Sequence, residues 1–382
     1  MTPAFQRDGV SIFQGDCRSV LRSMPADSVQ CCVTSPPYFG LRDYGVDGQI
    51  GLEATIPEFV AEMVEVFAAV RRVLHPSGTV WMNIGDSYAN DGKWGGHTGG
   101  KHVAALHCSP IGRNKRYTGL KPKDMCLIPE RLFIALQDDG WWVRSKIAWC
   151  KKSPMPESVT DRPTNSWEPI ALLTRNAKYF YDAEAVKEDD TGRRCNEFRR
   201  GTYVNNETFN NSGTLNGSQG EYIDTTGRNM RNVWHLGPEP YPDAHFATFP
   251  TEIPRRAIKA GTSEHGCCPA CRAPYKRIVD KTKLTRERPN EYTKRTGQEG
   301  TGNSCANTVA GVASRTTGWE PTCKCDAGKP VPCRVLDPFF GSGTTGEVAQ
   351  ELGCECWGIE LNAEYIELAA RRFKQRTFLV GA

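Results

Sequence analysis

Apolar and polar positions alternate between two kinds of pattern along most of this chain. Short apolar runs bounded by Gly, Pro or Asp are typical of buried strands, whereas apolar residues spaced three and four apart are typical of helices with one buried face. The clearest helical pattern spans residues 57–74, where Pro57 suits the first turn. Strands are predicted at 11–15, 29–33, 79–84, 141–149, 168–174, 179–180, 334–336 and 354–359, and helices at 18–23, 57–74, 127–137, 251–260, 344–352 and 362–373.

Strands that alternate with helices in this way predict βαβ units and a mainly parallel sheet. Two stretches interrupt the pattern, because Asn, Gly, Thr and charged residues replace the apolar periodicity there. We interpret both stretches as insertions. The predicted parts are a first α/β half (10–185), a loop-rich insertion (186–230), a short segment (231–262), a cysteine-containing basic insertion (263–330) and a second α/β half (331–376).

Length and composition are those of an ordinary globular protein with two or three domains. The chain has 382 residues, of which 38% are hydrophobic and 24% are charged. No apolar run approaches the roughly 18 residues that a membrane helix needs, and the first nine residues are polar, so we expect neither a membrane span nor a signal peptide. We therefore expect a cytoplasmic protein whose sixteen cysteines are free thiols or metal ligands.

The distribution of charge is more informative than its sum. The net charge is only +4, which does not by itself indicate a nucleic-acid partner. Residues 101–123, however, contain six Lys or Arg and no acid, and residues 272–295 contain nine basic residues against three acidic ones. Both stretches are rich in polar loop residues with interleaved aromatics, which suits contact with a phosphate backbone. Solvated loops are the alternative for either stretch.

Residues 33–40, Val-Thr-Ser-Pro-Pro-Tyr-Phe-Gly, end the predicted strand 29–33 abruptly. Prolines cannot donate to a sheet ladder, and Pro36 biases Ser35 away from helix, so a rigid turn is expected. In open α/β sheets the carboxyl ends of the strands are where ligands bind. The turn offers a hydroxyl on Ser35, the Pro36 carbonyl and the Tyr38 ring, which suit an exocyclic amine on a flat ring. A proline-rich turn without chemistry is the alternative.

A second turn, Asp-Pro-Phe-Phe-Gly-Ser-Gly-Thr-Thr-Gly at 337–346, lies between a predicted strand and a predicted helix. A nucleotide-binding turn requires this context. Gly341 and Gly343 would let the backbone approach a ligand, and Glu360 ends the next strand, where a carboxylate accepts ribose hydroxyls. The spacing is not that of a dinucleotide-binding fingerprint, and Asp337 would repel a pyrophosphate. A ligand with a cationic amino-acid end and a ribose fits better, namely S-adenosylmethionine.

The two turns, in this order, resemble those of amino-directed DNA methyltransferases of the β arrangement. In that family a Ser/Asp-Pro-Pro-Tyr motif precedes the cofactor-binding half, and the resemblance covers residues 10–185, 230–260 and 330–375. It implies an α/β, Rossmann-like S-adenosylmethionine-dependent methyltransferase fold with a mainly parallel seven-stranded sheet. Loop-rich and zinc-ribbon-like insertions would be added to this fold.

The resemblance also implies roles for individual residues. Asp16 would accept from the cofactor's amino group, residues 245–250 would close over its methionine end, and residues 149–152 and 161–168 would form walls of the target-base pocket. Tyr38, with Phe39, would stack on the base. The implied catalytic residues are Ser35, Pro36, Pro37 and Tyr38, and the implied cofactor-binding residues are Asp16, Cys17, Thr34, Phe249, Asp337, Pro338, Phe339, Gly341, Gly343, Thr344 and Glu360.

The implied reaction moves a methyl group from S-adenosylmethionine to the exocyclic amine of a base flipped out of double-stranded DNA. Ser is typical of cytosine-N4 enzymes at position 35, whereas adenine-N6 enzymes carry Asp or Asn there, so cytosine N4 is favoured and adenine N6 is the alternative. A bacterial or phage-encoded, nucleoid-associated enzyme of restriction-modification is expected. The recognition sequence, a cognate nuclease and the oligomeric state are left open.

A paired-cysteine arrangement lies within the second insertion. Cys268-Pro-Ala-Cys271 and Cys323-Lys-Cys325 have the spacing by which four thiolates close a tetrahedral zinc site. Cys267 is an alternative to the first ligand, and Cys305 is a substitute. Incidental thiols are the alternative to a metal site. We assign this module and residues 187–230 jointly to target recognition.

Two further classes of protein compete with the DNA methyltransferase. A zinc-dependent DNA-binding protein could carry an inactive methylase fold, but intact Ser35, Tyr38, Asp337, Gly341 and Gly343 argue against it. An RNA or protein-glutamine methyltransferase could use a similar turn. Asn is usual at the Ser35 position there, and the basic insertions favour DNA.

Overall fold

A computed structural model describes residues 2–41, 45–89, 118–154, 156–188, 227–237, 239, 249–287 and 307–375 of the chain. The chain divides into two compact units. The first unit comprises Met1–Ala185, Arg231–Lys276 and Pro321–Ala382, and the second comprises Val186–Met230 and Arg277–Glu320. No helix among the described residues is long and apolar enough to cross a membrane.

The described part of the first unit is built on a nine-stranded sheet with the order β1-β2-β11-β10-β3-β4-β6-β5-β7. Neighbouring strands are parallel except where β1 meets β2 and where β6 meets β4 and β5. The strands are β1 (Phe5–Arg7), β2 (Val10–Gln14), β3 (Val29–Thr34), β4 (Leu74–Asn83), β5 (Trp142–Lys151), β6 (Trp167–Thr174), β7 (Val233–Leu236), β10 (Arg334–Asp337) and β11 (Glu355–Glu360).

The prediction of a mainly parallel α/β sheet is confirmed, but the described sheet has two strands more than the predicted seven. Both are short edge strands. β1 forms a hairpin with β2 in which Phe5 pairs with Ile12, and β7 pairs in parallel with β5. Segments of three and four residues are too short to show a period. The predicted strand at 179–180 was wrong, because β6 ends at Thr174 and the Phe180 N–H instead donates to the Ser77 carbonyl at 2.8 Å.

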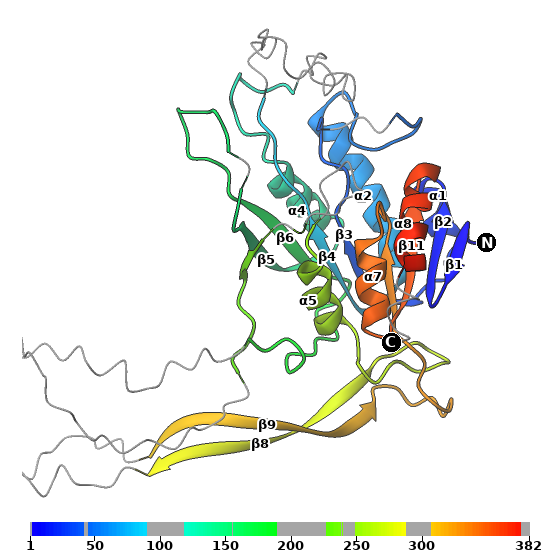
Figure 1. Ribbon diagram of the computed structural model, residues 1–382, viewed down its shortest axis with the longest axis vertical. Coiled ribbons are helices and arrows are strands. Elements are labelled where there is room, and N and C mark those ends of the chain that lie inside the picture. The colour runs from blue at the N-terminus through cyan, green and yellow to red at the C-terminus, as the bar shows by residue number, and fades with distance from the viewer. Residues whose placement is uncertain are drawn as a thin grey trace, which may run out of the picture. The chain divides into compact units, whose positions relative to one another are not determined.

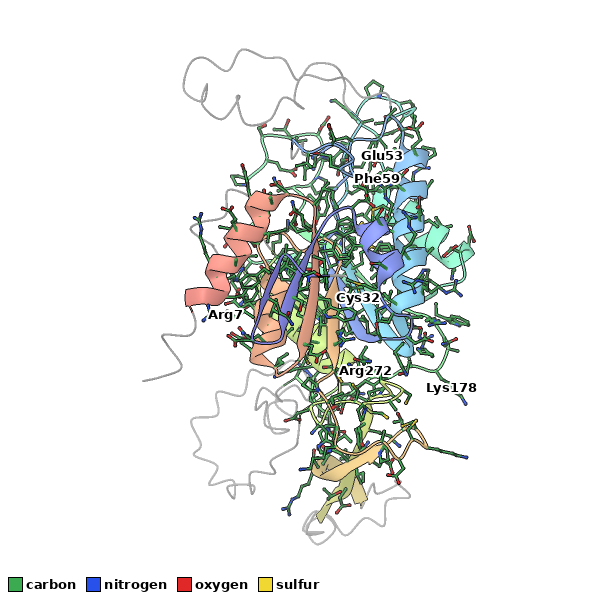
Figure 2. The ribbon with its side chains drawn as sticks, turned by 90° about the vertical axis from the view of Figure 1, so that its right-hand side faces the viewer. Arg7, Cys32, Glu53, Phe59, Lys178 and Arg272 are labelled. Atoms are coloured by element: carbon green, nitrogen blue, oxygen red, sulfur yellow. The ribbon has the colours of Figure 1, made fainter. Side chains whose placement is uncertain are left out.

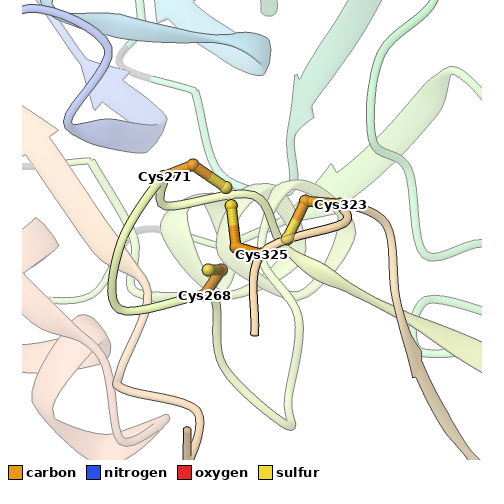
Figure 3. A group of neighbouring side chains, drawn as sticks. All are labelled: Cys268, Cys271, Cys323 and Cys325. Carbon is orange, nitrogen blue, oxygen red and sulfur yellow. The ribbon is translucent and has the colours of Figure 1, made fainter. Parts of the chain in front are cut away.

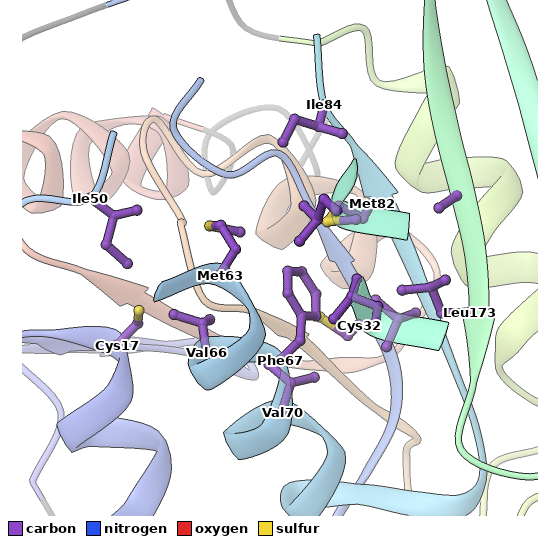
Figure 4. Packing of buried hydrophobic residues seen from close by; sticks show 14 of the residues in the cluster. Cys17, Cys32, Ile50, Met63, Val66, Phe67, Val70, Met82, Ile84 and Leu173 are labelled. Carbon is purple, nitrogen blue, oxygen red and sulfur yellow. The ribbon is translucent and has the colours of Figure 1, made fainter. Parts of the chain in front are cut away.

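Helices cover both faces of the sheet. Successive side chains of β3 point to opposite faces, and all of them are buried, so each face must be covered. Cys32 packs in one hydrophobic cluster with Phe67 and Val70 of α2 (Ile56–Val73; Figure 4). Its neighbour Cys31 points the other way, with its Sγ 3.7 Å from the Ala257 carbonyl of α5 (Glu252–Gly261). The remaining helices of this unit are α1 (Cys17–Ser23), α4 (Ile128–Asp138), α7 (Thr344–Glu351) and α8 (Ala363–Gln375).

The longest helix, α2, begins with a capping box. The Thr55 hydroxyl accepts from the Glu58 N–H at 3.3 Å, and the Glu58 carboxylate accepts from the Thr55 N–H at 3.0 Å. Its apolar face, which includes Phe59 and Phe67, is buried in the cluster that also contains Cys32 of β3. Lys178, by contrast, lies at the surface (Figure 2). The six predicted helices are all found, with ends shifted by a few residues at most.

The order of the strands creates a switch point between β3 and β10. The two strands are adjacent and parallel, with Val335 opposite Cys31. From β3 the chain crosses through α2 to β4 on one side, and from β10 it crosses through α7 to β11 on the other. The two turns that follow β3 and β10 therefore lie side by side at the carboxyl edge of the sheet, where open α/β sheets bind ligands.

The described part of the second unit contains a long two-stranded ribbon of β8 (Tyr275–Glu287) and β9 (Asn307–Pro321) (Figure 1). The sequence pattern gave no strand here, because Thr, Lys and Arg occupy the positions that apolar residues fill in a buried strand. Near the ends of the first insertion, Glu188 and Arg228 exchange backbone hydrogen bonds of 2.9 and 3.0 Å. Residues 189–226, 101–117, 245–248 and 288–306, and Cys305 with them, lie outside the described residues.

Candidate active site

A cavity of about 440 Å³ opens at the carboxyl edge of the sheet in the first unit. Its walls come from the segments that follow β2, β3, β10 and β11, from the ends of β4 and β5, from the start of β6, and from Phe249. Both turns singled out in the sequence therefore border one cavity. Its volume lies in the range of sites for nucleotide-sized ligands.

Most of the residues predicted for the site line this cavity. The three exceptions are Thr34, Asp337 and Gly343, which lie directly behind the wall. Phe39 also points away from it, because its ring is buried against Phe59 at a centroid distance of 5.6 Å. The predicted residues that line the cavity are Asp16, Cys17, Ser35, Pro36, Pro37, Tyr38, Phe249, Pro338, Phe339, Gly341, Thr344 and Glu360.

Asp337 joins the two turns from behind the wall. Its carboxylate, only 1% exposed, accepts from the Thr34 hydroxyl at 2.8 Å, the Thr345 hydroxyl at 2.7 Å and the Phe339 N–H at 3.1 Å. Burial raises the pKa of Asp337 to about 7, although these donors oppose the shift. The carboxylate was predicted to face a cationic ligand. Instead it connects β3 to the residues after β10, and this set of bonds is called the Asp337 bridge below.

The glycines of the second turn serve two different purposes. Gly341 has a φ of +50°, and a Cβ there would meet nothing within 4 Å, so its backbone is open to the cavity. A Cβ on Gly346 or Gly358 would instead lie within 2.6 Å of the Phe340 ring. Gly343, with a φ of +84°, also faces that ring. Except at Gly341, the glycines therefore make room for Phe340, which is buried beneath the turn.

Two carboxylates line the side of the cavity formed by β2, β10 and β11. Glu360 accepts from the Gly341 N–H at 2.8 Å and the Asn362 N–H at 2.9 Å, and burial raises its pKa. Asp16 caps α1 through the Ser19 N–H at 3.1 Å and pairs with Arg18 at 2.7 Å. Burial alone would raise the pKa of Asp16, but the hydrogen bonds from Arg18 and Ser19 outweigh it and lower the pKa.

A polar network lines the other side, where β3, β4 and β5 end and β6 begins. The Tyr38 hydroxyl lies 2.8 Å from Glu168 Oε2 and 3.1 Å from Asn83 Oδ1, so it can donate a hydrogen bond to either oxygen. Asn83 Nδ2 donates to the same Glu168 oxygen at 3.3 Å. Lys151 pairs with the other oxygen and lies 5.2 Å from the centre of the Trp149 ring. These contacts hold the Tyr38 ring in one orientation beside Ser35.

Several lining residues were missed in the sequence. Residues 149–152 and 161–168 were expected as walls, and Trp149, Lys151 and Glu168 from them do line the cavity. Asn83 was not singled out, although an amide at the end of a buried strand is a usable signal. The remaining residues that were missed come from loops without a motif, from the second turn or from the first turn of α8: Leu41, Val46, Gly48, Gln49, Ile50, Phe340, Ser342, Leu361, Asn362 and Tyr365.

The four paired cysteines form a separate cluster in the first unit. The Sγ atoms of Cys268, Cys271, Cys323 and Cys325 all lie within 4.8 Å of one another (Figure 3). A tight turn brings the first pair together, in which the Arg272 N–H donates to the Cys268 carbonyl at 2.9 Å and Arg272 adopts a φ of +62°.

The geometry distinguishes the two adjacent thiols of Cys267 and Cys268. The Cys268 Sγ lies within 4.8 Å of the Sγ atoms of Cys271, Cys323 and Cys325. Cys267 points elsewhere, since its Sγ contacts the Pro332 carbonyl at 3.5 Å. Cys268, and not Cys267, therefore belongs to the cluster.

Comparison with known proteins agrees with this architecture. The "DNA methylase" family model of N6 and N4 methyltransferases matches residues 29–268 and 334–371. Type II methyltransferase M.Cfr9I of Citrobacter freundii is 37% identical over 96% of this chain and 88% of its own length. Type II methyltransferase M.SmaI of Serratia marcescens is 35% identical over 96% of this chain and 91% of its own length.

Among solved structures, PvuII DNA methyltransferase (cytosine-N4-specific) superimposes with a TM-score of 0.54 at 15% identity, over 97% of this chain and 89% of that one. This likeness concerns the fold, which is the Rossmann-like fold of DNA methyltransferases. The chain belongs to the DNA methylase family, and the cavity between its two turns lies where that fold places its ligands.

The buried carboxyl of the Asp337 bridge predicts a pH-dependent stability. Its pKa rises from 3.8 in the unfolded chain to about 7 in the fold, so the folded state binds the extra proton between these values. Asp337 therefore contributes most to stability below pH 3.8, and this contribution is lost as the pH rises to 7. Between pH 5 and pH 8 the expected loss is roughly 3 kcal/mol.

Asp337→Asn should remove this loss, because the amide keeps an acceptor for Thr34 and has no proton to release. Urea unfolding of the variant and the wild type at pH 5 and pH 8 measures the difference. Asp138→Asn, at an exposed helix position, serves as the control. An equal pH dependence in the Asp337→Asn variant and the wild type would contradict the assignment.

The Tyr38 ring packs directly against Gly85, where there is no room for a side chain. A Cβ at this position would lie 2.5 Å from Tyr38 Cε2, so Gly85→Ala must displace the ring. Methyl transfer should fall roughly tenfold or more, with cofactor affinity unchanged. Gly237→Ala is the control, since a Cβ there meets nothing within 4 Å. A Gly85→Ala variant with the wild-type rate would show that the ring's position does not matter.

Proposed function

We propose that this protein transfers a methyl group from S-adenosylmethionine to N4 of a cytosine flipped out of double-stranded DNA. The observation that carries the proposal is the single cavity bordered by both turns. A hydroxyl and a carbonyl that can accept from an amine lie on one wall. An open glycine backbone and two carboxylates, which suit a nucleoside with an amino-acid end, lie on another.

The residues that would hold the cofactor are those that follow β2, β10 and β11. Asp16, whose lowered pKa keeps it ionised, is an acceptor for an amino group. Each carboxylate oxygen of Glu360 accepts one hydrogen bond from a backbone N–H group. The remaining lone pairs of these oxygens can accept hydrogen bonds from ribose hydroxyls. Gly341 leaves room for close approach of the ligand. The cofactor supplies an activated methyl group on a sulfonium.

The residues after β3 would prepare the base. The lone pair of an exocyclic amine is delocalised into its ring, which makes the amine a poor nucleophile. Ser35 Oγ and the Pro36 carbonyl would accept its two N–H hydrogens and so favour a pyramidal nitrogen. Tyr38 would stack on the ring, in the orientation that Glu168 and Asn83 hold. Positioning and hydrogen bonding would supply most of the rate.

Cytosine N4 is favoured over adenine N6 by Ser35, since the resemblance links Ser at this position to cytosine-N4 enzymes. The solved structure of similar fold is also named as cytosine-N4-specific. Adenine N6 is the alternative. Mass spectrometry of nucleosides from DNA treated with the protein and labelled cofactor decides between them. Label in N4-methylcytosine supports the proposal, and label in N6-methyladenine alone overturns the choice of base.

An inactive methylase fold that only binds DNA is the alternative from another class, and absence of label from every nucleoside would favour it. The relatives are named as Type II methyltransferases, which supports a role beside a cognate restriction nuclease. DNA as substrate also supports a cytoplasmic, nucleoid-associated protein of bacterial or phage origin. Residues 187–230, with the cysteine module, are proposed for target recognition.

We also propose that the four-cysteine cluster binds one structural zinc ion. Four thiols within 4.8 Å of one another match the donor set of a closed tetrahedral site. Such a site would tie the chain before β8 to the chain after β9, and no step of methyl transfer involves it.

Ser35→Ala removes an acceptor that is used only by the reacting amine. Turnover should fall roughly 100-fold, because one preorganised hydrogen bond in a transition state is worth about 3 kcal/mol. Affinity for S-adenosylmethionine, measured by calorimetry, should stay within about twofold, since Ser35 lies on the β3 side of the cavity. Ser11→Ala, in β2 and away from the cavity, is the control. Full turnover in the Ser35→Ala variant would exclude Ser35 from the chemistry.

Metal analysis of protein purified without chelator should find about one zinc per chain. Cys325→Ser should lower the content well below one, whereas Cys150→Ser, a half-buried cysteine outside the cluster, should not change it. Zinc far below one equivalent in the wild type would reject the site.

A further inference from the structure

In the β8–β9 ribbon, the residues whose side chains are described form no buried core. In the described parts of its strands, residues 275–281 and 314–321, no side chain is buried, and Ile278 is 41% exposed. A two-stranded ribbon of this kind is marginally stable in water on its own. Its strands nevertheless have thirteen and fifteen residues, longer than the strands of the main sheet. A long ribbon that buries little apolar surface indicates an element that binds a partner.

The charge of the ribbon specifies the kind of partner. The β8 sequence Tyr-Lys-Arg-Ile-Val-Asp-Lys-Thr-Lys-Leu-Thr-Arg-Glu contains five basic residues against two acidic ones. Lys276 and Lys281 are exposed. An anionic partner is therefore favoured over an apolar one, and the major groove of B-DNA is wide enough for a two-stranded ribbon. At about 3.4 Å per residue, β8 is roughly 44 Å long, more than one turn of the double helix.

Cross-strand contacts stabilise the ribbon near its start. The Arg277 guanidinium lies 4.3 Å above the Trp319 ring and donates to the Thr316 hydroxyl at 3.0 Å. The Thr317 hydroxyl donates to the Ile278 carbonyl at 3.4 Å. Lys276 and Lys281 of β8 are exposed, so their side chains are the positions at which binding can be tested.

The four-cysteine cluster lies at the two ends where the ribbon joins the first unit. Cys271 comes shortly before Tyr275, the first residue of β8, and Cys323 follows Pro321, the last residue of β9. The Thr322 hydroxyl donates to the Pro274 carbonyl at 2.7 Å and so links the same two segments. One ion held by both cysteine pairs would fix these ends together, which favours pairing of the strands between them.

The first insertion contacts the ribbon as well. Lys187 Nζ donates to Ser314 Oγ of β9 at 2.7 Å. Both residues belong to the second compact unit, which combines the two insertions that interrupt the α/β pattern. The ribbon is therefore part of an additional unit and not a stray hairpin.

We propose that the β8–β9 ribbon is a DNA-binding arm whose basic strand contacts the phosphates along a groove, and that the metal at the four-cysteine cluster fastens the arm. This inference rests on the proposed function, because it takes double-stranded DNA as the partner. Beyond that function, the inference names the structural element that holds the duplex and the metal site that stabilises this element.

The test compares two double variants of equal charge. Lys276→Ala with Lys281→Ala removes two exposed lysines of β8, and Lys178→Ala with Lys259→Ala removes two exposed lysines of the first unit. Binding of a mixed-sequence 30-base-pair duplex is measured at several salt concentrations. The ribbon variant should bind roughly tenfold more weakly, and its log–log salt slope should be smaller by about 1.8, or 0.9 per lost phosphate contact. The control should change neither.

A second pair of variants tests the metal. Cys323→Ser with Cys325→Ser should lose the metal and weaken DNA binding about as much as the lysine variant, while affinity for S-adenosylmethionine stays unchanged and shows that the α/β unit is folded. Cys354→Ser, at a cysteine of the first unit outside both the cluster and the cavity, is the control. Unaltered DNA affinity and salt slope in both ribbon variants would overturn the inference. Equal competition by duplex RNA would overturn the assignment to DNA.

The outcomes separate this inference from the proposed function. If the wild type methylates DNA and the ribbon variants bind DNA normally, the ribbon is not a DNA-binding arm, but the proposed methyltransferase activity stands. If DNA binding depends on the ribbon but no methyl transfer is detected, the proposed methyltransferase activity is rejected, but the DNA-binding role of the ribbon stands.

Discussion

The Asp337 bridge is the interaction on which the site depends. It joins Thr34, the residue before the Ser35-Pro-Pro-Tyr turn, to Thr345 in the helix after the glycine-rich turn. The two hydroxyls belong to segments some 300 residues apart in the chain, and β3 and β10 bring them together at the switch point of the sheet. A single buried carboxyl thus fixes the spacing of two walls that must cooperate. Its raised pKa reflects the cost of placing a carboxyl where water cannot reach it.

The two sides of the cavity differ in their physical character. On the β2, β10 and β11 side, carboxylates already bonded to backbone N–H groups present their remaining lone pairs at an open glycine. On the β3, β4 and β5 side, an ion pair and an amide fix one aromatic ring. This division suits a reaction in which one ligand carries a reactive group and the other must be held flat beside it.

The α/β half of this account was predictable from sequence because its signals are local. Apolar periods predicted α2 and β3, and the Pro-Pro and Gly-rich turns indicated where ligands bind. The direction in which a side chain points is not local. Asp337 lies in the correct motif, yet its carboxylate faces inward toward Thr34 of β3. Gly343 is needed in the motif because a Cβ there would meet the buried Phe340 ring. Asn83 and Glu168 meet Tyr38 only after β4 and β6 pair. The β8–β9 ribbon escaped prediction because exposed strands carry no apolar alternation.

We propose that residues from both ends of the chain form one reaction site in which a cofactor and a flipped base meet. A crystal structure of the protein with S-adenosylhomocysteine and a duplex containing its target site tests this most directly. We expect the cofactor product to lie against Asp16, Gly341 and Glu360 with its sulfur facing Ser35, and an extrahelical cytosine to stack on Tyr38. A cofactor product bound outside this cavity, or a base held away from the Ser35 turn, would contradict it.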